Sequence, residues 1–176
     1  DNNHIWESSF SNVVSNRTWC PQCSTFYRKE HIVRDLLEYL LNTKFPKKKP
    51  KWNINPKTNK LLELDGYSEE LSIAFEFQGL HHYKTGVFYK NEDDLVYIKY
   101  KDKIKKQNCS NNNVKLLVID DKFKITEKEK ILSYILELLN NLSIRVVKLI
   151  TNKKLNELFN KTTSIQKEFI LKAKEY

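Results

Sequence analysis

The chain has 176 residues, 40% of them hydrophobic and 12% aromatic, so we expect one compact domain with a buried core, with room for a small appendage, rather than a disordered polymer. No apolar run reaches the roughly 18 residues of a membrane span. Nor is there a secretory signal pattern at the N-terminus, so we expect an intracellular protein. The formal net charge of +9 favours a polyanionic partner, either nucleic acid or an anionic membrane surface.

Met is absent throughout, including at position 1, which predicts that the chain is part of a longer polypeptide. We expect three parts: a small N-terminal unit over residues 1–27, a main domain over 28–150 and a helical extension over 151–176. The N-terminal unit is short and polar, and it contains two of the three Cys, Cys20 and Cys23. Their CxxC spacing suits one face of a tetrahedral Zn²⁺ site. A redox pair is the alternative, but no thioredoxin-like pattern surrounds it.

Residues 28–42 have a helical pattern with one acidic side chain on the apolar stripe. At 100° per residue, Glu30 falls in the same narrow sector as Val33 and Leu37. A carboxylate that faces a core needs a partner, such as a metal ion or a Lys across the site. The alternative is a first-turn acid favoured by the helix dipole and held at the rim.

Two stretches concentrate the positive charge. Lys44 to Lys60 contains seven Lys and no acid, and Lys99 to Lys106 contains five Lys and one Asp. Phosphate contacts dominate nucleic-acid affinity, so these stretches predict phosphate binding, although a merely solvated surface and an AT-rich coding sequence are the alternatives. The residues expected to bind nucleic acid are Lys47, Lys48, Lys49, Lys51, Lys101 and Lys103.

Two strands are predicted next, over residues 61–67 and 71–78, joined as a hairpin. Residues two apart on a strand share a face, so Glu76 and Gln78 lie on the same face. The hairpin would bring Asp65 beside Glu76, and paired carboxylates can hold a hard cation such as Mg²⁺. The alternative is a solvated strand face on which Glu76 and Gln78 meet water.

Further elements complete the main domain. We expect a short strand near residues 52–54, a helix over 94–108, a buried strand over 114–119 and a further strand over 144–150. Between the last two, a helix should end near Asn141 and begin with a capping box formed by Thr126 and Glu129. Cys109 is expected to be a buried packing residue. This order predicts an α/β or α+β fold, with a small mixed sheet flanked by helices.

A family resemblance joins these residues. In order they are Glu30, then Leu64-Asp65-Gly66-Tyr67, then Phe75-Glu76-Phe77-Gln78-Gly79-x-His81-His82-Tyr83, then Asp102-x-x-Lys105. Over roughly residues 28–120 the pattern resembles the PD-(D/E)XK nuclease superfamily, on the branch of very-short-patch-repair and homing-type endonucleases. The resemblance implies a restriction-endonuclease-like core and a metal-dependent DNA endonuclease.

The resemblance also implies roles for individual residues. Asp65 and Glu76 would bind Mg²⁺ or Mn²⁺, with Glu30 completing or supporting the metal shell. Gln78 stands where the superfamily has a Lys, and Lys105 or a His would compensate for that missing cation. His81 or His82 would exchange a proton with the attacking water or the leaving oxygen.

The N-terminal unit resembles, in part, the small zinc-ribbon repeats found beside such nucleases. This second resemblance implies that His4, Cys20 and Cys23 bind Zn²⁺, with the first Cys of the repeat missing from the chain.

Two other classes of function remain open. A non-catalytic nucleic-acid-binding module could keep the nuclease fold, and Gln78 is the residue that favours it. A structural or interaction protein with incidental basic charge would leave the grouping of Glu30, Asp65 and Glu76 unexplained. Homodimer formation through the C-terminal part is a further possibility, and we expect no membrane partner.

Overall fold

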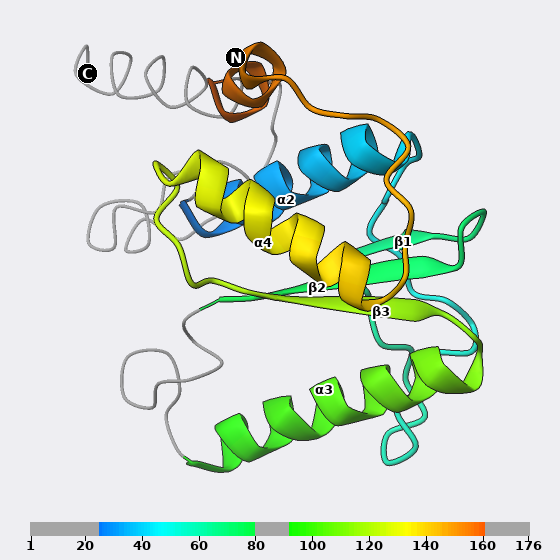
Figure 1. The fold of residues 1–176 in the computed structure, drawn as a ribbon. Coiled ribbons are helices and arrows are strands. Elements are labelled where there is room, and N and C mark those ends of the chain that lie inside the picture. The colour runs from blue at the N-terminus through cyan, green and yellow to red at the C-terminus, as the bar shows by residue number, and fades with distance from the viewer. Residues whose placement is uncertain (1–24, 80–91, 161–176) are drawn as a thin grey trace, which may run out of the picture. The chain divides into compact units, whose positions relative to one another are not determined.

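The computed structural model describes residues 25–79 and 92–160 (Figure 1). The chain forms two compact units. The sheet unit is Leu37–Leu149, and the terminal unit combines Asp1–Leu36 with Ile150–Tyr176. Helix α2 spans Thr25–Leu41, so its last turn belongs to the sheet unit and its earlier turns to the terminal unit. In the terminal unit, residues 152–160 are also helical.

The sheet unit contains a mixed three-stranded sheet in the order β1-β2-β3. Strand β1 spans Gly66–Ser68, β2 spans Ile73–Gln78 and β3 spans Lys115–Asp120. Strands β1 and β2 are antiparallel, whereas β2 and β3 are parallel. Parallel neighbours need a crossover connection, and here it contains helix α3, Glu92–Asn111. The predicted α/β class with a small mixed sheet is therefore confirmed.

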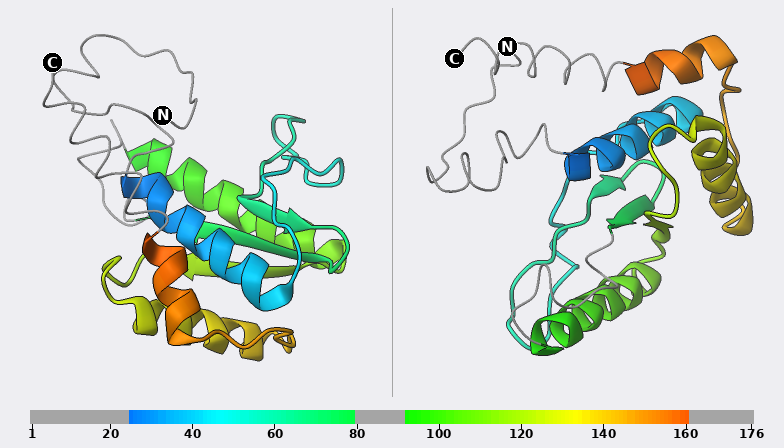
Figure 2. Two further views of the ribbon diagram at one scale, coloured as in Figure 1. Left: turned by 90° about the horizontal axis from the view of Figure 1, so that it is seen from above. Right: turned by 90° about the vertical axis from the view of Figure 1, so that its left-hand side faces the viewer.

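Two helices pack against β3 from opposite sides of the sheet (Figures 1 and 2). Helix α4, Lys128–Asn141, buries Ile131, Ile135 and Leu139, which are four apart and so lie along one side of the helix. Helix α3 covers the other side of the sheet. None of the helices in the described part of the chain has an apolar stretch that would span a bilayer.

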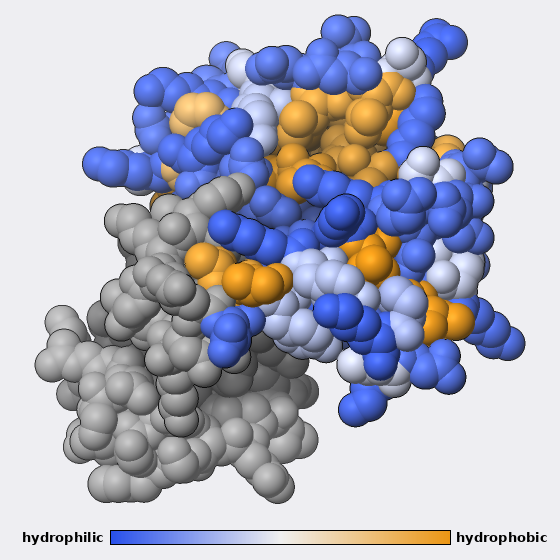
Figure 3. All heavy atoms as spheres, turned by 90° about the horizontal axis from the view of Figure 1, so that it is seen from below, coloured by the Kyte–Doolittle hydropathy of each residue, from blue (hydrophilic) through white to orange (hydrophobic). Residues whose placement is uncertain are grey.

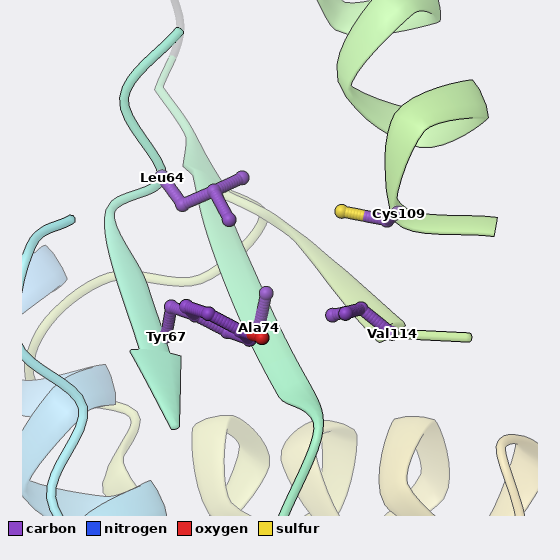
Figure 4. Close-up of a cluster of buried hydrophobic side chains, with 5 residues drawn as sticks. All are labelled: Leu64, Tyr67, Ala74, Cys109 and Val114. Carbon is purple, nitrogen blue, oxygen red and sulfur yellow. The ribbon is translucent and has the colours of Figure 1, made fainter. Parts of the chain in front are cut away.

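The two faces of β2 have different surroundings, although nearly all of the strand is buried. Ala74 packs with Leu64, Tyr67, Cys109 and Val114, and Cys109 comes from α3 (Figure 4). Phe75, on the opposite face, packs against Phe45 with ring centroids 6.1 Å apart. The prediction that Cys109 is a buried packing residue is confirmed, because this thiol is fully buried and forms no disulfide. Glu76 lies on the same face as Ala74, toward α3.

Asn and Ser supply backbone conformations that Gly often supplies. The chain has three Gly, and the left-handed positions after the helices are taken by Asn42, Asn113 and Ser143, with φ angles of 52°, 56° and 51°. Asn reaches this region at lower cost than most residues because its short polar side chain bonds locally. These residues end α2, α3 and α4.

Several predicted boundaries were wrong. Residues 61–65 are outside β1, and only isolated bridges join Lys48 with Leu64 and Ile54 with Leu61, so no strand forms near 52–54. Helix α4 begins after Glu127, which makes no side-chain capping bond, so the predicted capping box is absent. Residues 144–150 are not a strand, because the N–H groups of Val147 and Lys148 both donate to the Leu40 carbonyl, at 2.9 and 3.1 Å.

Candidate functional site

Asp65 is held at the start of the hairpin. Gly66 pairs with Phe75 in the antiparallel register, so the preceding residue, Asp65, lies next to Glu76. The backbone N–H of Phe77 donates to Oδ2 of Asp65 at 2.9 Å. This bond fixes the carboxylate against β2. The predicted pairing of Asp65 with Glu76 is therefore present in the structure.

Glu76 is a buried carboxylate on the central strand, with 9% of its surface exposed. The alternative of a solvated strand face is therefore wrong. Nζ of Lys105 lies 2.6 Å from Oε2. Oε1 is buried and has no hydrogen-bond partner among the described residues. An unpaired buried carboxylate oxygen is costly, so this atom marks a place where a ligand would be stabilising.

The surroundings of Glu76 raise its pKa to about 7. Burial is the largest cause, because it disfavours the charged form. Lys105 opposes the shift, while the negative charges of Asp65 and Asp102 add to it. Three acids therefore share one electrostatic environment, and the Lys105 ammonium is the main compensating charge.

Helix α3 supplies the polar side chains opposite Glu76. Lys105 and Asp102 are three residues apart, which places them on neighbouring turns of one helix face. Nε2 of Gln78 lies 3.5 Å from Oδ2 of Asp102, at the limit of a hydrogen bond. Gln78 thus takes part in the cluster through an acid on α3. We define the acidic site as Asp65, Glu76, Gln78, Asp102 and Lys105.

The basic segment between α2 and β1 borders the acidic site. Nζ of Lys47 lies 4.0 Å from Oδ1 of Asp65, with 37% of the Lys47 side chain exposed. Lys48 and Lys49 form ion pairs with Glu69 and Glu63, at 2.7 and 3.6 Å. Those two Lys are partly neutralised. Lys51 and Lys103 are exposed.

Amide side chains, which sequence reasoning missed, attach this basic segment to α3. Nδ2 of Asn108 donates to Oδ1 of Asn53 and to the carbonyl of Ile54, both at 3.0 Å. Asn53 is fully buried, and its own Nδ2 donates to the Leu62 carbonyl at 3.0 Å. The only sequence signal was an Asn inside an irregular segment, which is indistinguishable from a turn residue.

Glu30 belongs to the terminal unit, whereas the acidic site belongs to the sheet unit. Glu30 is buried, and Nη2 of Arg34, one turn along α2, lies 2.7 Å from its Oε1. One partner of Glu30 in the structure is thus an Arg of the same helix. A role for Glu30 beside Asp65 and Glu76 stays a prediction.

The remaining predicted ligands lie outside the described residues. These are His81 and His82, which follow β2, and the expected zinc ligands His4, Cys20 and Cys23. Within residues 25–79 and 92–160, no group of three or more His, Cys, Asp or Glu side chains is arranged to hold a metal ion.

Asp65 and Glu76 nevertheless fit a hard cation. Mg²⁺ is usually bound by one or two carboxylates, together with waters and substrate phosphates, rather than by a cage of protein ligands. Glu76 would offer Oε1, which lacks a hydrogen-bond partner in the described part of the chain, and Asp65 would offer Oδ1.

Comparisons with known proteins give distant viral relatives. The chain is 29% identical over 105 residues to uncharacterized protein 033L of Invertebrate iridescent virus 3, covering 59% of the chain and 54% of the relative. It is 36% identical over 81 residues to uncharacterized protein 307L of Invertebrate iridescent virus 6, covering 43% and 41%. It is 35% identical over 92 residues to uncharacterized protein 094L of Frog virus 3, covering 51% and 59%.

The chain thus spans about half the length of the curated relatives it matches. No protein family matches the chain. No solved structure matches it either. The names of the viral relatives state no activity, so any function rests on the site itself.

Proposed function

We propose that this protein is a metal-dependent endonuclease that hydrolyses phosphodiester bonds in DNA. The observation that carries the proposal is the buried Glu76 carboxylate, which lies beside Asp65 and has one oxygen without a hydrogen-bond partner among the described residues. Two buried carboxylates side by side lower the stability of the fold unless a cation or a proton compensates their negative charge. The resemblance to PD-(D/E)XK nucleases supports the same assignment.

In this proposal, Asp65 and Glu76 hold Mg²⁺ or Mn²⁺. The bound ion supplies a water of lowered pKa and neutralises charge on the scissile phosphate. Lys105 keeps positive charge next to Glu76 and stands in for the Lys that Gln78 replaces. Gln78, through Asp102, helps to fix the polar side of the site. His81 and His82 remain candidates for proton transfer.

DNA is proposed as the substrate because of the charge around the site. Lys47 borders Asp65, and the exposed Lys51 and Lys103 belong to the two Lys-rich stretches. Exposed Lys side chains next to a metal ion held by carboxylates could bind the phosphates on either side of the cleaved bond. We also propose that the N-terminal unit binds Zn²⁺, and this rests on its resemblance to zinc-ribbon repeats alone.

The second candidate is a non-catalytic nucleic-acid-binding module. It is favoured by the contact of 2.6 Å between Lys105 and Glu76, since an ammonium can satisfy part of a buried carboxylate without any metal. The presence of Gln78 where the nuclease superfamily has a Lys also favours the non-catalytic module. In this case the acidic site would be a retained structural ion pair.

Cleavage of supercoiled plasmid distinguishes the two candidates. We expect nicking with Mg²⁺ or Mn²⁺, and a fall of roughly a hundredfold or more for Glu76→Gln, because several kcal/mol of transition-state stabilisation are lost. Glu137→Gln is the matched control, because Glu137 is an exposed acid on α4.

Equal nicking by the wild type and Glu76→Gln would show that Glu76 is not part of the nuclease site. DNA binding without cleavage, equal in both proteins, would support the non-catalytic module. A randomised duplex library, used in the same assay, separates that outcome from strict sequence specificity.

A further inference from the structure

Two tyrosines form an aromatic pair on the first half of α3, with Tyr97 exposed and Tyr100 half-buried. The rings of Tyr97 and Tyr100 are stacked, with centroids 6.3 Å apart and an angle of 21° between their planes. Tyr97 is 43% exposed, and the neighbouring Val96 is 64% exposed. Figure 3 views the α3 side of the molecule and shows orange and pale patches among hydrophilic side chains. Large aromatic side chains exposed on a charged helix are candidates for an interaction surface.

Each tyrosine ring carries an ammonium group over its face. Nζ of Lys57 lies 4.3 Å from the Tyr100 ring centroid, and Nζ of Lys101 lies 5.0 Å from that of Tyr97. Asn55 is buried, and its Nδ2 donates to the Tyr97 hydroxyl at 3.4 Å. The aromatic pair is thus braced by the basic segment that Asn108 attaches to α3. We call Tyr97, Tyr100, Lys57 and Lys101 the tyrosine platform.

A role in the core does not explain the tyrosine platform. The part of α3 that packs on the sheet includes the fully buried Cys109, more than two turns further along. Exposed contacts between a Lys and an aromatic ring are weak. Replacing Tyr97 with Ala would even improve intrinsic helix propensity. The chemistry that suits two flat rings flanked by flexible ammonium groups is a strand of nucleotides, with one π-face and one phosphate per unit.

We propose that the tyrosine platform binds unpaired nucleotides, whose bases stack on Tyr97 and Tyr100 while Lys57 and Lys101 contact the phosphates. This inference rests on the proposed function, which makes the ligand a nucleic acid. Stacking of a base on an aromatic side chain is stronger than an exposed cation–π contact, so a base displaces the ammonium group from the ring. The displaced ammonium then lies within reach of the adjoining phosphate.

The tyrosine platform lies along the same helix as the acidic site. Tyr97, Lys101 and Lys105 are spaced four residues apart, so they follow one side of α3. At 1.5 Å per residue, the eight residues from Tyr97 to Lys105 span about 12 Å. An unpaired strand bound to the tyrosine platform would therefore extend along α3 toward Lys105 and Glu76. The substrate class is DNA with a single-stranded stretch beside the cleaved bond, rather than a fully paired duplex.

The test measures dissociation constants of the full chain for a labelled single-stranded oligonucleotide and for its duplex, in EDTA. We expect the double variant Tyr97→Ala/Tyr100→Ala to bind the single strand about tenfold or more weakly, with little change for the duplex. The double variant Tyr97→Phe/Tyr100→Phe keeps both rings and should stay within about twofold of the wild type. Photocrosslinking of a bromouracil oligonucleotide to the wild type, mapped by mass spectrometry, should mark Tyr97 or Tyr100.

Equal weakening on both substrates would overturn the platform as a stacking site and leave only a general phosphate surface. Unchanged single-strand binding by the Ala variant, or crosslinks elsewhere, would overturn it too. Because the binding assay contains no divalent metal, its result is separate from cleavage. Single-strand binding that needs the tyrosines, in a protein that cuts no DNA, would support this inference while rejecting the nuclease.

Discussion

Glu76 makes stability depend on pH in a direction opposite to that of most acids. Its pKa is raised to about 7 in the folded protein from an ordinary value of 4.5, mainly by burial. Between these values the folded state holds a proton that the unfolded state releases. Stability contributed by this group is therefore full below about pH 4.5 and is lost as pH rises through 7. The difference corresponds to roughly 3 kcal/mol.

We predict that Glu76→Gln removes this dependence, because the amide has the same shape and does not titrate. In EDTA, the stability of the variant relative to the wild type should increase between pH 5 and pH 8, by up to roughly 3 kcal/mol. Urea unfolding at several pH values measures it. The control Glu137→Gln should give a constant difference. A constant difference for Glu76→Gln as well would mean that Glu76 keeps an ordinary pKa in the folded state.

The pairing of Asp65 with Glu76 was predictable from sequence, because strand alternation and a short hairpin determine it from local residues alone. The contact between Lys105 and Glu76 was not, since it depends on how α3 docks on the sheet. Lys105 was expected as a replacement cation or as a residue that orients the site or contacts phosphate, not as the direct partner of Glu76. The place of Lys47 beside Asp65 was missed for the same reason, because it depends on the path of an irregular segment.

At the scale of the elements, Gly66 determines how closely β1 approaches β2. A Cβ atom on Gly66 would lie 2.1 Å from Cε1 of Phe75, whose ring is fully buried. The ring therefore occupies the space of a missing side chain. The close approach of Gly66 to Phe75 places the preceding residue, Asp65, next to Glu76.

We predict that Gly66→Ala destabilises the fold by roughly 1–3 kcal/mol, because the Phe75 ring must move within a packed core. Urea unfolding measures the loss. The double variant Gly66→Ala/Phe75→Leu should lose less than the sum of the two single variants, since the smaller side chain leaves room for the new methyl group. Additive losses would show that the methyl group meets some other obstacle.

Longer elements were easier to predict than short ones. Strand β3 and helices α3 and α4 were recognised because many residues share one pattern. Residues 144–150 are rich in β-branched side chains, but their N–H groups bond to the end of α2, so tertiary contacts overrode local propensity. The capping box failed because Glu127 takes the N-cap position and accepts the N–H of Lys124 at 2.8 Å.

At the scale of the whole molecule, the net charge of +9 means that the proposed DNA binding should depend strongly on salt. Lys51 and Lys103 are exposed within the two Lys-rich stretches, so each should contact a phosphate. We predict that Lys51→Ser and Lys103→Ser each reduce the slope of log affinity against log salt by about one.

Binding of a duplex across a salt series measures these slopes. Lys130→Ser is the control, because Lys130 lies on α4, across the sheet from α3, and pairs with Glu127 at 2.7 Å. Its slope should equal that of the wild type. Slopes unchanged in the Lys51 and Lys103 variants would place the phosphate contacts on other residues.

The crossover between β2 and β3 has a consequence for when the acidic site forms as the chain folds. The residues of the acidic site are far apart in sequence, and Lys105 reaches Glu76 only after α3 has packed over the parallel strands. Contacts of long sequence separation form slowly, because loop closure comes before they stabilise anything. The burial that raises the pKa of Glu76 also depends on this packing. The acidic site therefore forms together with the complete sheet rather than before it.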